Sequence, residues 1–364
     1  MSNDRLQKLY TYMEQQGLDA MLITTPKHVY YVTEFLTDPH ERFLGLVIPA
    51  KGEPVLIVPA LDLEPATKAS SVTSIVTHTD TQNPYEVLKT VLPANTKRLG
   101  LEKGDLTVLR FEALAAIVEA AEYVDIDEPI RQMRMVKTAD EVKRMKQALH
   151  ITEAGLAAVI QKVTVGMTEL DVVAELEYQL KKLGAQGLAF PTLVLAGEKS
   201  AMPHGAPGTR TVNAGELLLF DLGIAYDGYY SDITRTFAVG EIDAKQRDIY
   251  ETVLAANQAA IEATKPGVTL ASLDKIARDI IADKGYGEYF VHRLGHGLGI
   301  DVHEYPSVHG ENQDLLQEGL VFTIEPGIYL SGVAGVRIED DVWVTKDGCD
   351  VLSSFPKELT VIGG

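Results

Sequence analysis

The sequence has a single cysteine, Cys349, so it cannot form an intrachain disulfide. Basic residues are few as well: 33 Lys and Arg stand against 52 Asp and Glu, a formal net charge of −19. A chain this acidic repels phosphate backbones and anionic membrane surfaces, which argues against nucleic acid or a membrane as a partner. Long apolar runs are also lacking. Neither a signal peptide nor a transmembrane helix is expected, and the predicted location is the cytoplasm.

The composition is otherwise that of an ordinary globular protein. Apolar residues make up 46% and charged residues 23% of the chain, a profile typical of soluble domains. This much apolar material can form a large core without a disulfide or a structural metal. The length of 364 residues predicts two domains rather than one.

Helical and strand patterns alternate over the first part of the chain. Leu6, Leu9 and Met13 repeat at helical spacing before Gly17 interrupts the pattern. Short apolar runs and further periodic segments predict strands near 19–25, 43–49, 54–59, 98–102 and 123–126, and helices near 86–92 and 108–121. This alternation predicts a small α/β domain over residues 1–127.

A second domain is expected over residues 128–364, after a linking segment near 127–133. Thr138 and Glu141 form a capping-box pattern, which predicts a long helix towards Val163. Further helices are expected near 168–183, 244–263 and 270–284, with strands over most of the remainder.

This second region spaces out five side chains that can bind metals. Each lies in a short segment that is typical of a strand or a strand end, and several have glycine beside them: Asp221, Asp232, His296, Glu325 and Glu339. Two hard divalent cations bound side by side need several anionic oxygens, some of them shared. If the five side chains converge, the site can generate a nucleophilic hydroxide at neutral pH.

Two of the carboxylates are expected on paired strands. Asp221 lies inside an apolar run, and Asp227-Gly228 is a strong hairpin signal between it and Asp232. Strand periodicity then places Asp221 and Asp232 on the same face. Carboxylates that face one way repel each other unless a cation lies between them. The competing interpretation, in which one caps a turn and the other is solvated, is weak for Asp221 and stronger for Asp232.

The other three candidates are each less specific on their own. His296 lies between glycines, which permit close backbone approach, but a loop histidine would look the same. Glu325 precedes Pro326, which favours an extended backbone. Glu339 alternates with Arg337 along a charged strand, and such a face is usually exposed to solvent. The order and number of the five segments carry the prediction, because each places its side chain at a rigid strand or strand end.

Together these motifs resemble the pita-bread metallopeptidases, and among them the Xaa-Pro dipeptidases (prolidases) and aminopeptidases P. The resemblance rests on Phe220-Asp-Leu-Gly, Ser231-Asp-Ile-Thr-Arg-Thr, Gly295-His-Gly-Leu-Gly, Val302-His-Glu-Tyr-Pro, Thr323-Ile-Glu-Pro-Gly and Val336-Arg-Ile-Glu-Asp. It implies an α+β fold: a small α/β N-terminal domain, used for dimerisation and pocket closure, followed by a pita-bread (creatinase/aminopeptidase-like) catalytic domain. A homodimer is expected.

The resemblance also implies roles for single residues. Asp221 would chelate one metal, Asp232 and Glu339 would bridge both, and His296 and Glu325 would hold the second. His303 would stabilise the oxyanion, Glu325 would shuttle protons, and His204 would contact the substrate at the mouth of the site. His292 and Arg337 match positions around the ligands and the substrate. Four carboxylates and one imidazole suit Mn²⁺, although Co²⁺ or Zn²⁺ would also bind.

The substrate expected from this resemblance is a Xaa-Pro dipeptide, cleaved before proline by a hydroxide that bridges two metals. An aminopeptidase P acting on longer peptides is the first alternative, and a metal-free binding protein of the same fold is the second. Many prolidases have a basic residue where this chain has Ser307, so Arg293, His292 or Arg337 is expected to bind the carboxylate instead. Asp38, His40 and Arg42, in a charged loop, are expected to help close the pocket and restrict substrate length. The loop resembles that of some bacterial prolidases, in which it reaches the active site of the dimer partner.

Overall fold

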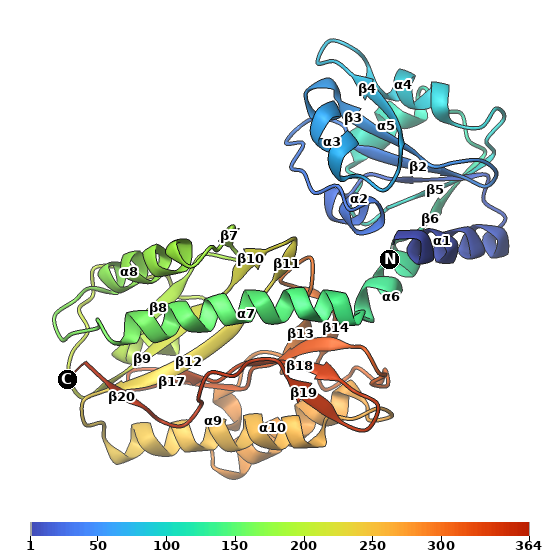
Figure 1. Ribbon diagram of the computed structural model, residues 1–364. Coiled ribbons are helices and arrows are strands. Elements are labelled where there is room, and N and C mark those ends of the chain that lie inside the picture. The colour runs from blue at the N-terminus through green and yellow to red at the C-terminus, as the bar shows by residue number, and fades with distance from the viewer. Residues whose placement is uncertain (1, 364) are drawn as a thin grey trace. The chain divides into compact units, whose positions relative to one another are not determined.

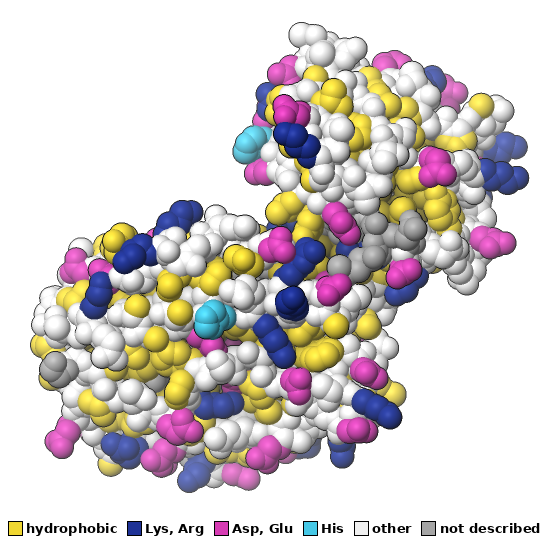
Figure 2. Space-filling model, in the orientation of Figure 1, with side chains coloured by type: hydrophobic (Ala, Val, Ile, Leu, Met, Phe, Trp, Pro, Cys, Tyr) yellow, Lys and Arg dark blue, Asp and Glu magenta, His cyan; other side chains and the backbone are white. Residues whose placement is uncertain are grey.

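We describe residues 2–363 of a computed structural model, in which the chain forms two compact units, Met1–Arg134 and Met135–Gly364 (Figure 1). Among these residues, no helix combines the length and the apolar character that crossing a bilayer requires. Acidic and basic side chains are interspersed over the face of each unit that Figure 2 shows.

The N-terminal unit is built on one mixed sheet of six strands in the order β4-β3-β2-β1-β5-β6. Strands β1, β5 and β6 are parallel to one another, β3 is parallel to β4, and β2 is antiparallel to both of its neighbours. The elements are α1 (Ser2–Gln16), β1 (Ala20–Ile23), α2 (Pro26–Thr33), β2 (Gly45–Pro49), β3 (Val55–Pro59), α3 (Leu63–Ala69), β4 (Ser74–His78), α4 (Pro84–Val91), β5 (Arg98–Leu101), α5 (Val108–Ala115), β6 (Glu122–Asp125) and α6 (Asp127–Met135).

The core of this unit follows from the apolar runs of its strands. Leu22 and Leu99 from the sheet pack with Leu88 of α4 and Leu114 of α5 in one buried cluster. Three elements were not predicted from the sequence, namely α2, α3 and β4, and a fourth, α5, is shorter than expected. Residues 26–33 form a helix, α2, that begins at Pro26, a residue well suited to a first helical turn. Helix α5 ends at Ala115, several residues before the expected end.

The segment expected to link the domains is itself helical, since α6 runs from Asp127 to Met135. The boundary between the two units along the chain falls in its last turn, between Arg134 and Met135.

The C-terminal unit contains two helix pairs with strands between them, and each pair is followed by its own group of strands (Figure 1). The first half comprises α7 (Ala139–Ile160), α8 (Glu169–Lys182), β7 (Gly187–Leu188), β8 (Leu193–Ala196), β9 (Glu216–Leu222), β10 (Ile224–Tyr226), β11 (Tyr229–Tyr230) and β12 (Ile233–Val239). The second comprises α9 (Ala244–Ala263), α10 (Leu270–Asp283), β13 (Gly295–Gly297), β14 (Glu304–Val308), β15 (Val321–Ile324), β16 (Gly327–Leu330), β17 (Ala334–Arg337), β18 (Asp340–Val344), β19 (Cys349–Val351) and β20 (Val361–Ile362).

Each helix pair buries its apolar face on the strands that follow it. Leu156 of α7 and Leu176 of α8 pack with Phe220 of β9, whereas Val253 of α9 and Leu273 of α10 belong to a cluster with strands β15 to β18. The predicted capping box of α7 is present, because Thr138 and Glu141 each bond to the other's backbone N–H. The two larger sheets of this unit have the strand orders β20-β12-β9-β8 and β14-β13-β15-β18-β19. The metal-ligand candidates lie on the strands of these two sheets and on the segments beside them.

Candidate metal centre

One pocket in the C-terminal unit gathers all five predicted metal ligands. It has a volume of about 570 Å³, and its lining includes Asp221, Asp232, His296, Glu325 and Glu339 together with His204, His292, Arg293, His303 and Arg337. Apolar side chains such as Phe190 and Val302 complete the wall. A larger hollow of about 920 Å³ lies beside α1 in the N-terminal unit, but none of the residues lining it is a histidine. The smaller pocket is therefore the candidate site.

Three of the five side chains already approach the geometry of a metal site. Asp232, His296 and Glu339 each offer one ligand atom, and these atoms lie within 4.8 Å of one another. All three side chains are buried. The Oδ1 atoms of Asp232 and Asp221 are also buried and have no hydrogen-bond partner. Buried carboxylate oxygens normally have partners, so this donor set fits divalent cations bound between the strands.

The two aspartates are brought together by strand register. Strands β9 and β12 are antiparallel, and Asp221 lies opposite Thr234. Asp232 precedes Thr234 by two residues, so it shares that face of the ladder with Asp221. The connecting turn contains Asp227 and Gly228, both with positive φ, as expected for the hairpin of β10 and β11.

Glycines on both sides of His296 allow β13 to lie against its neighbours. A Cβ atom on Gly295 would lie 1.8 Å from the carbonyl oxygen of Thr323, and one on Gly297 would lie 2.1 Å from that of Tyr305. The imidazole is fixed as well. Its Nδ1 donates to the carbonyl oxygen of Gly297 at 3.1 Å, because a carbonyl can only accept. The lone pair of Nε2 is left facing the pocket, which is the arrangement a metal ligand needs.

The buried site contains several carboxyl groups close together, which is unfavourable when all of them are ionised. Nε2 of His296 lies 3.3 Å from Oε1 of Glu325 and 3.6 Å from Oδ2 of Asp232. Burial, followed by the charges of neighbouring carboxylates, raises the pKa of Asp232 and Glu339 well above their usual range. Burial likewise raises the pKa of Glu325 to about 7 and lowers that of His296 to about 3. The carboxylates can all ionise only with a compensating positive charge, which divalent cations would supply.

A buried hydrogen-bond chain links Asp221, a candidate metal ligand, to His292. Arg337 donates to Asp221 through Nη2 and, at 2.7 Å, to the hydroxyl of Tyr329 through Nη1. The Nδ1 atom of His292 donates to the carbonyl oxygen of Arg293 at 2.7 Å, so its Nε2 accepts from Tyr329 at 2.8 Å. The polar atoms of His292 are thus used within the protein. Burial lowers the pKa of this histidine to about 4, which keeps it neutral.

Tyr329 is a member of the site that the sequence analysis missed. It is buried, and its hydroxyl accepts a hydrogen bond from Arg337 and donates one to His292. Thr234 and Thr323 were missed in the same way: the hydroxyl of Thr234 donates to Glu339 at 2.7 Å, and that of Thr323 donates to Glu325 at 3.3 Å. The only signal in the sequence is that each threonine lies two residues from a candidate ligand, on the same face of the extended chain.

The remaining predicted residues lie around the mouth and in the other unit. His303 stacks edge-on against His296, with 4.1 Å between ring centroids, and His204 is exposed at the pocket. Arg293 reaches across the pocket wall, where its Nη1 donates to Ser307 at 2.9 Å.

The charged loop belongs to the N-terminal unit. Arg42 donates from Nε to Asp80 at 2.8 Å, while Asp38 and His40 are largely exposed. His40 has a positive φ of 54°, and its backbone N–H donates to Asp38 at 2.9 Å. The loop is thus anchored at Arg42 and open at its tip.

Comparison with known proteins agrees with this geometry. Residues 143–346 match the model of metallopeptidase family M24, and residues 5–136 match the Creatinase/Prolidase N-terminal domain. The chain is 46% identical over 362 residues to "Putative dipeptidase YkvY" of Bacillus subtilis (strain 168), covering 99% of this chain and 100% of that protein. These matches confirm the family that the motifs resemble.

Solved structures agree over the whole length. The prolidase of Pyrococcus horikoshii OT3 superposes with a TM-score of 0.91 at 38% identity, covering 98% of this chain and 99% of the other. The X-Pro aminopeptidase of Thermotoga maritima MSB8 superposes with a TM-score of 0.89 at 35% identity, covering 96% and 100%. The fold expected from the motifs, an α/β N-terminal domain followed by a pita-bread catalytic domain, is confirmed.

Proposed function

Because this chain belongs to metallopeptidase family M24, we propose that it is a Xaa-Pro dipeptidase, which hydrolyses the bond before proline in Xaa-Pro dipeptides. The observation that carries the proposal is the buried trio Asp232, His296 and Glu339 in a pocket that also contains two arginines and further histidines. The relatives support the same activity, since they include a protein named as a dipeptidase and a prolidase.

The metal ligands are proposed as follows. Asp232 and Glu339 would help to hold both cations, Asp221 would bind one of them, and His296 and Glu325 would bind the other. Mn²⁺ is the proposed metal, because four carboxylates and one imidazole form a hard donor set, with Co²⁺ or Zn²⁺ as substitutes. When bound, two such ions supply a hydroxide nucleophile and polarise the scissile carbonyl.

The protein's own groups then handle protons and orientation. Glu325 lies beside His296, with 3.3 Å between its Oε1 atom and the imidazole Nε2, and is proposed to accept a proton and return it to the leaving nitrogen. His303 lies beside the ligand His296 and is placed to stabilise the oxyanion. His204, at the mouth, contacts the substrate backbone.

Arg293 is proposed to bind the carboxylate of the substrate proline. It is the arginine of the pocket whose guanidinium reaches the Ser307 hydroxyl, whereas that of Arg337 is directed to Asp221 and Tyr329. Arg293→Ala should therefore raise KM for a Xaa-Pro dipeptide by about 10- to 100-fold, the loss expected for a hydrogen bond between charged groups. The same variant should treat the dipeptide amide, which lacks the carboxylate, much as the parent does. An equal loss on both substrates would contradict this role.

The central experiment compares Ala-Pro with Ala-Pro-Ala as substrates for the protein supplied with Mn²⁺. We expect turnover of the dipeptide alone. Faster cleavage of the tripeptide would identify an aminopeptidase P, the activity named for the Thermotoga maritima neighbour. A protein that binds no stoichiometric metal and cleaves neither peptide would be a binding module.

Two further features are proposed for the intact protein. We expect a cytoplasmic homodimer, and light scattering would test the dimer by its mass.

In this dimer, Asp38, His40 and Arg42 are proposed to help close the substrate pocket and restrict substrate length. Arg42→Ala should then raise KM for dipeptides. Asp80→Ala is the matched control, because it removes the hydrogen-bond partner of Arg42 and leaves the guanidinium in place. Identical kinetics of both variants and the parent would refute the role.

A further inference from the structure

Asn257, on helix α9, contacts the backbone immediately before two of the proposed metal ligands. Its side chain is fully buried. The amide nitrogen Nδ2 donates to the carbonyl oxygen of Ile324 at 3.1 Å and to that of Ile338 at 3.3 Å. These carbonyls directly precede Glu325 and Glu339. One amide group therefore ties together two chain segments whose next residues face the metal pocket.

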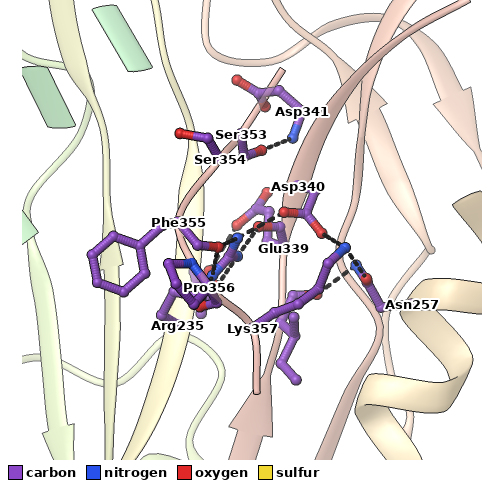
Figure 3. A network of polar contacts seen from close by, with 12 residues as sticks. Arg235, Asn257, Glu339, Asp340, Asp341, Ser353, Ser354, Phe355, Pro356 and Lys357 are labelled. Carbon is purple, nitrogen blue, oxygen red and sulfur yellow. Dashed lines mark hydrogen bonds and ion pairs between the residues drawn. The ribbon is translucent and has the colours of Figure 1, made fainter. Parts of the chain in front are cut away.

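Lys357 determines which way this amide points. Its ammonium group donates to Oδ1 of Asn257 at 3.0 Å and to Oδ2 of Asp340 at 2.6 Å (Figure 3). An ammonium group can only donate, so the oxygen of the Asn257 amide must face Lys357. The NH₂ group is then directed at the two carbonyls. Reversing the amide would place its NH₂ against the ammonium and its oxygen against both carbonyls.

The other side of the same network holds the backbone of Glu339. Arg235 is almost completely buried and donates from Nη2 to Oδ1 of Asp340 at 2.7 Å. Its Nη1 donates to the carbonyl oxygen of Glu339 at 2.5 Å, and its Nη2 also donates to that of Phe355 at 2.8 Å (Figure 3). The segment around Phe355 and Lys357 is thereby joined to strand β18 just behind the ligand.

We propose that Asn257 and Lys357 are positioning residues for the metal centre, which set the separation of Glu325 and Glu339 from behind. Neither residue lines the pocket, so neither is placed to touch substrate or metal. The inference rests on the proposed function, because it assumes that both glutamates bind metal. Groups that orient metal ligands in this way commonly change metal affinity by about 10- to 100-fold when they are replaced.

The test is a titration of the metal-free protein with Mn²⁺ by isothermal calorimetry, with circular dichroism to verify folding. Asn257→Leu removes the amide at similar volume, and Lys357→Met removes the ammonium but keeps the stem. Both should weaken Mn²⁺ binding by about tenfold or more. Lys357→Arg should retain most of the affinity, because a guanidinium can donate to both partners.

A matched control lies on the same helix. Thr252 is also buried on α9, and its hydroxyl donates only within the helix, to the carbonyl oxygen of Asp248 at 2.6 Å. Thr252→Val loses a buried hydrogen bond without touching the ligand segments, so its Mn²⁺ affinity should stay within about twofold of the parent. In the double variant Asn257→Leu/Lys357→Met, the loss should be little greater than in Asn257→Leu alone, because both act through one amide.

Parent-like Mn²⁺ affinity in folded Asn257→Leu would overturn the proposal. Should that variant fail to fold, Lys357→Met decides, because its side chain is 21% exposed and its removal leaves no enclosed cavity. Parent-like affinity there would overturn the proposal equally. A parent protein that binds no Mn²⁺ would overturn both this inference and the proposed function, whereas unchanged variants of a metal-binding parent would overturn this inference alone.

Discussion

At the scale of single residues, Asp232 has an unusual combination of properties. It is buried, its Oδ1 atom has no hydrogen-bond partner, and it faces Glu339 and Asp221. A carboxylate in such surroundings destabilises the metal-free protein. The same carboxylate becomes favourable when divalent cations bind, because the charges then attract. Asp232 thus has opposite effects on stability without and with metal.

Replacing Asp232 should therefore change thermal stability in opposite directions without and with metal. Asp232→Asn should raise the melting temperature of the metal-free protein at pH 8 by about 2–4 °C, the shift that ~1 kcal/mol produces in a domain of this size. It should also abolish most of the stabilisation by Mn²⁺ and lower activity at least about 100-fold. Scanning calorimetry with EDTA and with Mn²⁺ measures both. Asp347→Asn, at an exposed turn, is the control; a variant that melted below the parent without metal would contradict the argument.

At the scale of elements, strand β13 depends on two glycines to bring His296 into the site. The hydrogen bond from the His296 backbone to the Thr323 hydroxyl, 3.1 Å long, connects β13 to β15, which runs on towards Glu325. This close approach is possible only without a side chain at Gly295, because a Cβ atom there would overlap the Thr323 carbonyl. Packing of these two strands therefore controls the distance between two proposed ligands.

Gly295→Ala should displace β13 from β15. We expect the free energy of unfolding to fall by about 1–3 kcal/mol, as for other overpacked sites. We also expect Mn²⁺ affinity to fall at least about tenfold, which corresponds to ~1.4 kcal/mol of binding free energy, because the ligand His296 is displaced. Urea denaturation and Mn²⁺ titration measure the two effects. Gly348→Ala is the matched control, because a Cβ atom there would meet nothing within 4 Å and φ is not positive. Equal behaviour of the two variants would show that β13 can relax.

At the scale of the whole molecule, the titration of the buried site should dominate the pH dependence of stability. Burial lowers the pKa of His292 to about 4 and of His296 to about 3, so below about pH 6.5 the unfolded state binds more protons at these residues. Burial raises the pKa of Glu325 to about 7, and those of Asp232 and Glu339 rise as well, so here the folded state binds more protons. Above about pH 6.5 only the carboxyl effect remains.

Stability of the metal-free protein should therefore fall as pH rises from about 6.5 to 8, because the folded state must release protons that the unfolded state has already lost. Mn²⁺ requires the same carboxylates in their ionised form. The difference in melting temperature between samples with Mn²⁺ and with EDTA should widen over this range. Calorimetry at several pH values tests the prediction, and a constant difference would exclude coupling between these protons and the metal.

The sequence alone predicted those features that depend on interactions between residues close together in the chain. The capping box at Thr138 and Glu141 marked the start of α7, and the periodicity of residues 244–263 matched α9 to its ends. Strand alternation around the Asp227-Gly228 turn placed Asp221 and Asp232 on one face, as the register of β9 and β12 has it. Each of these depends on neighbours within a few residues, which is the range over which backbone geometry repeats.

Only the tertiary structure decided burial, charge state and the partners that come from distant segments. Taken alone, the alternation of Arg337 and Glu339 was typical of a solvated strand face, yet both side chains are buried, and Thr234 of β12 hydrogen-bonds to each of them. The tautomer of His296, the bridge made by Tyr329 and the ties made by Asn257 depend on atoms far apart in the chain. The types of the metal-binding residues can therefore be recognised from short sequence motifs. The distances between these residues in space and their proton affinities depend on burial and long-range contacts, which no local pattern encodes.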